Sequence, residues 1–185
     1  MSDEENDWRY RLVQHLYRLA EQSPNVPRAR AELAKIRRGI GKTFNADVFQ
    51  IVAQHNVPRL HEEQASLVIA LFGFYPVPLE TNRSAADEGE ISTESRHRQT
   101  LGTSLRELKD ENSDSDAPDR RLRSLLQSER EDLSAKLRQV VSLLRSHEIK
   151  IDWQQLLNDL IRWEDVKRSV QKRWSQDFWA PHTKS

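Results

Sequence analysis

The chain has 185 residues, no cysteine, and a formal net charge of zero from 29 basic and 29 acidic residues. This length suits one sizeable helical domain or two small ones, and the lack of cysteine excludes disulfides and thiolate chemistry. Only 5 glycines and a content of 31% charged residues favour helices, because long charged side chains lose little rotamer freedom there. We therefore expect an all-α protein of two small lobes with about eight helices.

The start of the chain is acidic and lacks the basic and then apolar pattern of a secretory signal. The most apolar stretch, residues 66–79, is interrupted by a glycine and two prolines and is shorter than the roughly 20 residues that span a bilayer. The sequence thus predicts a cytoplasmic protein with no membrane partner.

Four helices are predicted in an N-terminal lobe of residues 1–80. Apolar residues at steps of three and four define each of them. Pro27 suits the first position of the second helix, and Asn45 is a candidate cap for the third. The first helix covers about 8–21, the second begins at 27, the third begins near 45, and the fourth covers about 62–75.

A polar linker with a short helix is predicted over residues 81–117. Residues 80–98 have almost no large apolar side chains, so little burial can offset the entropy lost on ordering. Leu101, Leu105 and Leu108 have helical spacing, and residues 112–118 form a second break.

The C-terminal lobe, residues 118–185, carries clear helical patterns. Helices are predicted over about 118–128, 132–147 and 153–163, the last capped by Asp152. A final helix aligns four apolar residues at steps of four: Val166, Val170, Trp174 and Phe178.

The neutral net charge conceals segregation along the chain. Residues 80–119 hold eleven acids and five bases, residues 28–42 hold six bases and one acid, and residues 120–150 hold eight bases and four acids. Local excess of positive charge is typical of a phosphate-binding face.

Helical spacing gathers some of these bases on shared faces. Arg28, Lys35 and Arg38 fall opposite the apolar stripe of the second helix. Arg120 and Arg123 share a face of the sixth helix, joined by Arg130 if that helix extends so far, and Arg138 and Arg145 lie on one side of the seventh. A polyanion would relieve the repulsion between these like charges. A solvated helix face, or arginines whose stems lie along the core margin, explains the same spacing.

No catalytic constellation is evident. Gly41, Lys42 and Thr43 resemble part of a phosphate loop, but the earlier glycine and the preceding strand are missing. The six histidines include no pair four residues apart on a helix, so neither a metal site nor a cofactor is expected. Asp152 and Asp159 are better explained by a helix cap and an ion pair than by paired catalytic carboxylates. The sequence predicts no enzyme.

The five tryptophans offer stacking platforms for unpaired bases only where they are exposed. Trp8, Trp163 and Trp174 lie on apolar stripes and are expected in the core. Trp153 and Trp179 are open to either assignment.

Several blocks together resemble the small subunit, CasB, of the type I-E CRISPR effector complex Cascade. The blocks occur in the family's order and cover most of the chain. They are ArgAlaArgAlaGluLeuAlaLysIleArgArg (28–38), HisArgGlnThrLeuGlyThrSerLeu (97–105), ArgArgLeuArgSerLeuLeu (120–126), LysLeuArgGlnValValSerLeuLeuArg (136–145), IleAspTrpGlnGlnLeuLeuAsnAspLeuIleArgTrp (151–163) and ArgTrpSerGlnAspPhe (173–178).

This resemblance implies a non-catalytic subunit present in two copies, which contacts the backbone subunits and the large subunit. It also implies basic faces that guide the target and displaced DNA strands and stabilise the R-loop, while the guide RNA, contacted indirectly, supplies specificity. By block position it implies eight nucleic-acid-binding residues: Arg28, Lys35, Arg37, Arg38, Arg121, Arg123, Arg138 and Arg145.

Two other functions compete with strand binding. A protein-interaction adaptor would use the charged faces to dock subunits and would never contact nucleic acid. A free-standing DNA-binding regulator would need a recognition helix after a tight turn, and the breaks in this chain are too long or too rich in proline to favour one.

Overall fold

The structure, a computed structural model, describes residues 3–42, 44–76, 99–111 and 115–180, without the side chains of residues 3–7. The described ranges contain helices and no strand, which confirms the expected all-α class. The predicted linker over 80–98 lies outside the described residues, as do residues 112–114 of the predicted second break. The proposed domain boundaries therefore stay a prediction.

The described part of the N-terminal half forms four α-helices and one 3-10 turn. We call these helices the α1–α4 unit. They are α1 (Asp3–Gln22), α2 (Pro27–Arg37), α3 (Ala46–Gln54), η1 (Arg59–His61) and α4 (Glu62–Phe74).

Five further α-helices follow, which we call the α5–α9 unit. The short helix predicted near Leu101 is α5, and it packs against α9 and α6. The five are α5 (Leu101–Glu111), α6 (Ala117–Leu126), α7 (Arg130–Ser146), α8 (Trp153–Ile161) and α9 (Ser169–Trp179).

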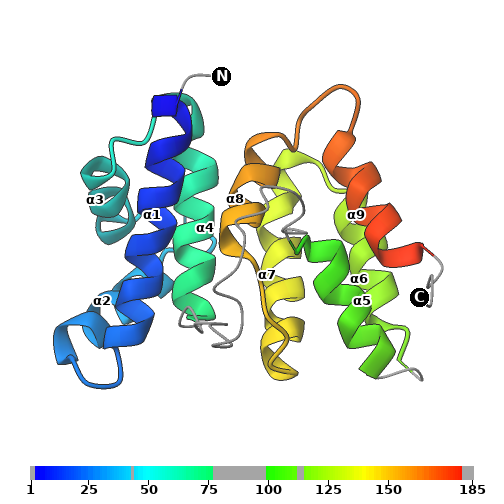
Figure 1. Ribbon diagram of the computed structural model, residues 1–185, viewed down its shortest axis with the longest axis horizontal. Coiled ribbons are helices and arrows are strands. Elements are labelled where there is room, and N and C mark those ends of the chain that lie inside the picture. The colour runs from blue at the N-terminus through cyan, green and yellow to red at the C-terminus, as the bar shows by residue number, and fades with distance from the viewer. Residues whose placement is uncertain (1–2, 43, 77–98, 112–114, 181–185) are drawn as a thin grey trace, which may run out of the picture.

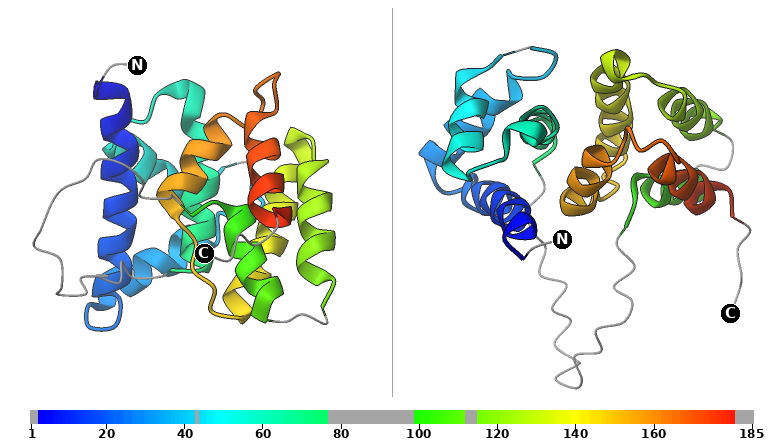
Figure 2. Two further views of the ribbon diagram at one scale, coloured as in Figure 1. Left: turned by 45° about the vertical axis from the view of Figure 1, so that its right-hand side comes forward. Right: turned by 90° about the horizontal axis from the view of Figure 1, so that it is seen from above.

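The two units lie side by side, with α4 and α8 at their boundary (Figure 1). The view from above in Figure 2 shows the same division. None of the described helices is both long and apolar enough to cross a membrane.

One hydrophobic core continues across this boundary. The rings of Phe72 on α4 and Trp153 on α8 are fully buried and meet nearly edge to face, with centroids 5.3 Å apart. Such aromatic pairs add about 0.5–1.5 kcal/mol beyond the burial of their area. The Tyr75 hydroxyl also donates a hydrogen bond to the Ile149 carbonyl oxygen at 3.2 Å. Apolar packing is therefore the main link between the units.

Two predicted helix caps are confirmed. The Asn45 side chain accepts a hydrogen bond from the Val48 backbone N–H at 3.1 Å, and Asp152 accepts one from the Gln155 N–H at 2.8 Å. Each bond satisfies a backbone donor that has no partner within its own helix. These side chains set where α3 and α8 begin.

The expected start of the last helix is wrong. Val166 is 97% exposed and precedes α9, which begins at Ser169. Asp165 accepts hydrogen bonds from the Lys167 backbone N–H and the Ser169 hydroxyl, and Arg168 has a left-handed φ of 50°. This polar turn takes Val166 out of the apolar stripe.

Two glycines permit close helix contacts. A Cβ on Gly73 of α4 would lie 2.6 Å from Ile36 Cγ1 of α2. A Cβ on Gly102 of α5 would overlap the backbone of Trp174 on α9, with 2.9 Å to its Cα. Backbone cannot move aside as a flexible side chain can, so the α5–α9 contact requires glycine.

Gly102→Ala is expected to lower the free energy of unfolding by about 1–3 kcal/mol, because the methyl group forces α5 away from α9. Alanine's higher helix propensity favours the opposite change by about 1 kcal/mol. Urea denaturation measures the difference, with Ser124→Ala on exposed α6 as the control. An unchanged or raised stability would contradict the close contact.

A pair of histidines links α1 to the end of α3. The rings of His15 and His55 are 5.0 Å apart and nearly perpendicular. Burial lowers the pKa of His55 to about 4, assisted by His15, Arg11 and Arg18. Burial also lowers the pKa of His15, against the effect of Glu32 at 3.7 Å. Both rings are therefore held neutral in the folded protein.

Folded His55 binds a proton less readily than unfolded His55, so the free energy of unfolding is expected to fall as pH drops from about 6.5 towards about 4. His55→Gln should flatten this dependence, measured by thermal unfolding over that range. His147→Gln, which alters an exposed histidine, should leave it intact. Equal pH profiles for wild type and His55→Gln would refute this origin.

Candidate nucleic-acid interface

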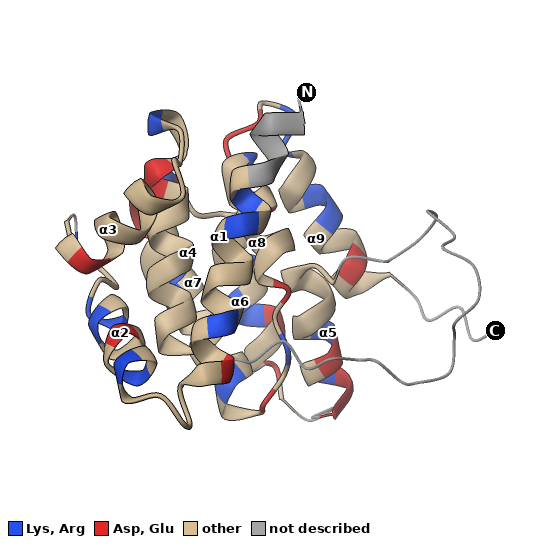
Figure 3. Ribbon diagram, turned by 60° about the vertical axis from the view of Figure 1, so that its left-hand side comes forward, with Lys and Arg blue, Asp and Glu red and all other residues tan. Residues whose placement is uncertain are grey.

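The exposed side of α2 forms the first basic surface. The helix buries Ala29, Leu33 and Ile36, and it packs against α1 and α4. Its opposite side carries bases, and Figure 3 shows them on successive turns of α2. All four predicted site residues of this segment are exposed: Arg28, Lys35, Arg37 and Arg38. The expected amphipathic division is confirmed.

These four bases differ in their partners. Lys35 Nζ lies 3.7 Å from Asp47 Oδ1, and both side chains are largely exposed. Within the described residues, Arg28, Arg37 and Arg38 form no ion pair. Arg37 and Arg38 lie at the C-terminal end of α2, where the helix dipole favours positive charge. Three of the four predicted bases of α2 are therefore exposed and form no ion pair with the described residues.

A groove lies between the turn that follows α2 and the α5–α9 unit. Its volume is about 700 Å³, and its cationic lining residues are Lys42, Arg121 and Arg138. Lys42 follows α2, Arg121 lies on α6 and Arg138 on α7. The structure thus brings together two predicted site residues and one base from the other unit. We call this the basic groove.

Arg123 does not lie in the basic groove. It forms an ion pair with Asp119, one turn earlier on α6, and its guanidinium lies 4.8 Å from the ring centroid of Trp179. Trp179 Nε1 also donates to Asp119 at 2.8 Å. The hydrogen bond from Arg123 lowers the pKa of Asp119. The positive charge of Arg123 is therefore largely offset by Asp119.

Arg145 also lies apart from the groove lining. Its guanidinium is 4.9 Å from the ring centroid of Phe74, so it packs across the boundary onto α4. This contact matches the alternative of an arginine at the core margin, although the side chain remains exposed.

Arg130 does not join the basic face of α6, because the helix does not extend so far. Helix α6 ends at Leu126, and Arg130 is the first residue of α7. Its guanidinium pairs with Glu63 on α4 and with Glu164 Oε2 at 3.2 Å. Arg130 therefore bridges the two units instead of extending a basic face.

Sequence reasoning missed Lys42 as a site residue. The basic count of residues 28–42 included it, but its only motif was the rejected phosphate loop. No pattern within one helix could pair Lys42 with Arg121 and Arg138, because the three belong to different elements. Their proximity depends on how the units pack.

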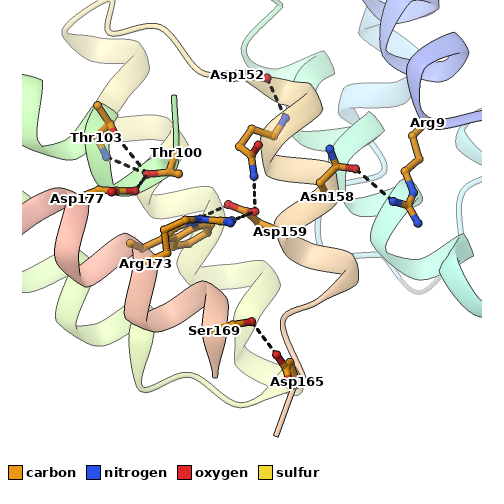
Figure 4. A network of polar contacts seen from close by, with 12 residues as sticks. Arg9, Thr100, Thr103, Asp152, Asn158, Asp159, Asp165, Ser169, Arg173 and Asp177 are labelled. Atoms are coloured by element: carbon orange, nitrogen blue, oxygen red, sulfur yellow. Dashed lines mark hydrogen bonds and ion pairs between the residues drawn. The ribbon is translucent and has the colours of Figure 1, made fainter. Parts of the chain in front are cut away.

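Asp159 forms the ion pair that the sequence predicts, and it is not paired with Asp152 as two catalytic carboxylates would be. It is buried and forms an ion pair with Arg173, and it accepts hydrogen bonds at 2.6 Å from Trp174 Nε1 and Gln155 Nε2 (Figure 4). Burial raises its pKa, while these donors act in the opposite direction. Asp152 is the α8 cap. Both carboxylates therefore have structural roles.

Neither the possible metal ligands nor the tryptophans form a binding site among the described residues. Within the described ranges, no group of three or more His, Asp or Glu residues could hold a metal ion. Trp8, Trp163 and Trp174 are core residues as expected, and Trp153 proves to be fully buried. Trp179 is 38% exposed but is stacked with Arg123. The basic surfaces are thus the chain's main candidate for binding.

Residues 32–179 match the protein family described as CRISPR-associated protein Cse2. The Cse2 protein of Thermus thermophilus is 36% identical over 62 residues, which make up 34% of this chain and 35% of that protein. The matched stretch therefore spans about a third of this relative's length.

Solved structures share the fold over nearly the whole chain. CasB from M. ruber has a TM-score of 0.65 and 25% identity, covering 97% of this chain and 94% of its own. A chain of a CRISPR RNA-guided surveillance complex has a TM-score of 0.68 and 27% identity, covering 96% and 93%. CasB from Thermus thermophilus, at 22% identity and a TM-score of 0.61, covers 98% and 100%.

Asp159→Ala is expected to lower the free energy of unfolding by about 3 kcal/mol, because Trp174 and Gln155 lose their acceptor and Arg173 its counter-charge. Asp152→Ala removes only a helix cap, at a cost of about 1 kcal/mol. Urea denaturation compares the two variants. Equal losses would argue against the buried network.

Proposed function

Because this chain belongs to the family of the CRISPR-associated protein Cse2, we propose that it is a non-catalytic subunit of a type I-E CRISPR effector complex that binds DNA and stabilises the R-loop. The observation that carries the proposal is the pair of basic surfaces. Exposed bases lie along α2, and the turn that follows α2 brings Lys42 into the basic groove with Arg121 and Arg138.

The relatives suggest where the chain works. A similar chain at 27% identity comes from a CRISPR RNA-guided surveillance complex, and one at 26% identity, with a TM-score of 0.69, from such a complex described as pre-nicking. We propose that this chain likewise assembles with backbone and large subunits and with a second copy of itself. A cytoplasmic location and an indirect relation to the guide RNA stay predictions.

Phosphate contacts would supply the binding. Arginine and lysine side chains hold phosphate oxygens without reading bases, so they fix the position of a strand while guide pairing provides the sequence specificity. Arg28, Arg37 and Arg38 suit this role because they are exposed and form no ion pair within the described residues. Lys35 and Arg123 would first have to leave Asp47 and Asp119.

The zero net charge of the chain limits its affinity when it is alone. Long-range attraction depends on net charge, whereas short-range contacts depend on local groups. We therefore expect weak binding by the isolated chain and a larger effect inside the assembled complex, where other subunits also contact the strands.

The triple variant Arg28→Gln, Lys35→Gln and Arg38→Gln is expected to weaken binding to single-stranded DNA. Each lost phosphate contact reduces the slope of log affinity against log salt by about 0.7, so the triple should reduce it by about 2. Fluorescence anisotropy across a salt series measures this slope, for the purified chain and for the assembled complex.

A matched triple, Arg18→Gln, Lys167→Gln and Lys172→Gln, removes the same charge from α1, from the turn before α9 and from α9 itself. It should change the slope much less. Equal effects of the two triples would indicate attraction by general charge. Unchanged retention of target DNA by a complex carrying the α2 triple would overturn the proposed role of α2.

The adaptor hypothesis remains the alternative. Arg130 and Arg145 contact Glu63 and Phe74 of the same chain, so these two residues carry neither hypothesis. Photocrosslinking from Arg38 and Arg138 positions in the assembled complex separates the two functions. Strand binding predicts DNA adducts at these positions, whereas an adaptor predicts protein adducts alone.

A further inference from the structure

A second hollow adjoins the basic groove and shares the turn after α2 and Ser134 with it. It lies at the boundary between the two units, lined by α3 and α4 from one unit and by α7 and the end of α8 from the other. Its volume is about 520 Å³. Pockets of about 300–1,000 Å³ hold drug-sized molecules. We call this hollow the boundary pocket.

The walls of the boundary pocket are mostly apolar. Leu67 on α4 and Phe49 on α3 are half-buried, so part of their apolar surface is still open to a ligand. Around them lie buried core residues that also line the pocket: Val48, Ala70, Leu133, Leu160 and Trp163. Because aromatic rings pair favourably with one another, Phe49 and Trp163 suit an aromatic ligand.

Two polar side chains of α4 in the lining lack hydrogen-bond partners. Ser66 Oγ and Gln64 Oε1 are shielded from solvent, and neither has a partner among the described residues. Most buried polar atoms in proteins are satisfied, so such exceptions require an explanation. Rotation about their side-chain bonds would present these oxygens to a bound molecule. An N–H or O–H group of that molecule could then donate to them.

The charged residues of the lining favour a neutral ligand. Three acids and three bases belong to it: Glu62, Glu63, Glu164, Lys42, Arg59 and Arg130. Arg130 already pairs with Glu63 and Glu164. Equal numbers of opposite charges give no net attraction for an anion or a cation, and the carboxylates oppose phosphate. The boundary pocket therefore differs in chemistry from the basic groove, whose lining has three cations and one acid.

We propose that the boundary pocket binds a small neutral aromatic molecule that carries an N–H or O–H donor. The rings would lie against Leu67, Phe49 and Trp163, and the donor would meet Gln64 or Ser66. Apolar burial then supplies most of the affinity, and the hydrogen bond sets the orientation. A single side chain of another protein would leave much of the pocket unfilled, and unfilled apolar space forfeits packing contacts.

The test uses N-phenylnaphthylamine, a neutral aromatic amine whose fluorescence rises in apolar surroundings. Titration into the full chain is expected to saturate at one molecule per chain. Phenylnaphthalene, which has the rings but no N–H group, should compete with about fivefold lower affinity, the value of one hydrogen bond of about 1 kcal/mol. The double variant Gln64→Met and Ser66→Ala should abolish this preference for the amine.

Leu67→Gln should weaken binding of the probe about tenfold, because it removes an apolar wall of the pocket. Leu143→Gln is the matched control, since Leu143 is a half-buried leucine of α7 outside the lining. It should leave the affinity unchanged. Circular dichroism verifies that both variants fold.

Four results would overturn the proposal. They are binding that does not saturate, equal weakening by Leu67→Gln and Leu143→Gln, displacement of the probe by an oligodeoxythymidylate, and exclusion of the probe from the assembled complex. The third would assign the pocket to a nucleic-acid strand, and the fourth would assign it to a neighbouring subunit. Each leaves the proposed function standing, because the α2 triple tests that function separately.

Discussion

The packing of α4 against α8 is the contact on which the rest of the structure depends. Phe72 and Trp153 are fully buried there, and the same apolar core continues into both units. Apolar burial has no direction, so directional contacts such as the Tyr75–Ile149 hydrogen bond are needed to fix how the units meet. That orientation places the turn after α2 beside α6 and α7. Without it, Lys42 and Arg138 would belong to separate surfaces.

Some basic residues of the chain form ion pairs with acids of the same chain, whereas others gather on a surface without such pairs. Asp47, Asp119 and Glu63 pair with Lys35, Arg123 and Arg130, so these cations are partly satisfied by the protein itself. The basic groove is different, because within the described residues none of its three cations forms an ion pair, although Glu131 also lies in its lining. This difference explains how a chain of zero net charge can present a local site for an anion.

The polar networks around Asp159 and Asp177 in the α5–α9 unit stabilise the fold. The donors around Asp159 come from α8 and α9, and the Thr100 hydroxyl donates to Asp177 at 2.5 Å, tying the start of α5 to α9. Buried polar groups with satisfied partners fix one arrangement of helices more sharply than apolar packing alone. These contacts hold α5, α8 and α9 together in one arrangement.

The amino-acid sequence by itself determined the helical class, the caps at Asn45 and Asp152, the apolar stripes and the solvent face of α2. These features depend on residues within one or two helical turns, so local spacing predicts them. Val166 was misplaced because a polar turn ended a pattern that looked continuous. Only the tertiary structure decided that Trp179 of α9 contacts Arg123 and Asp119 of α6, and that Lys42 joins Arg121 and Arg138. These contacts join residues far apart in the sequence, and the second exists only because apolar burial brings the two units together.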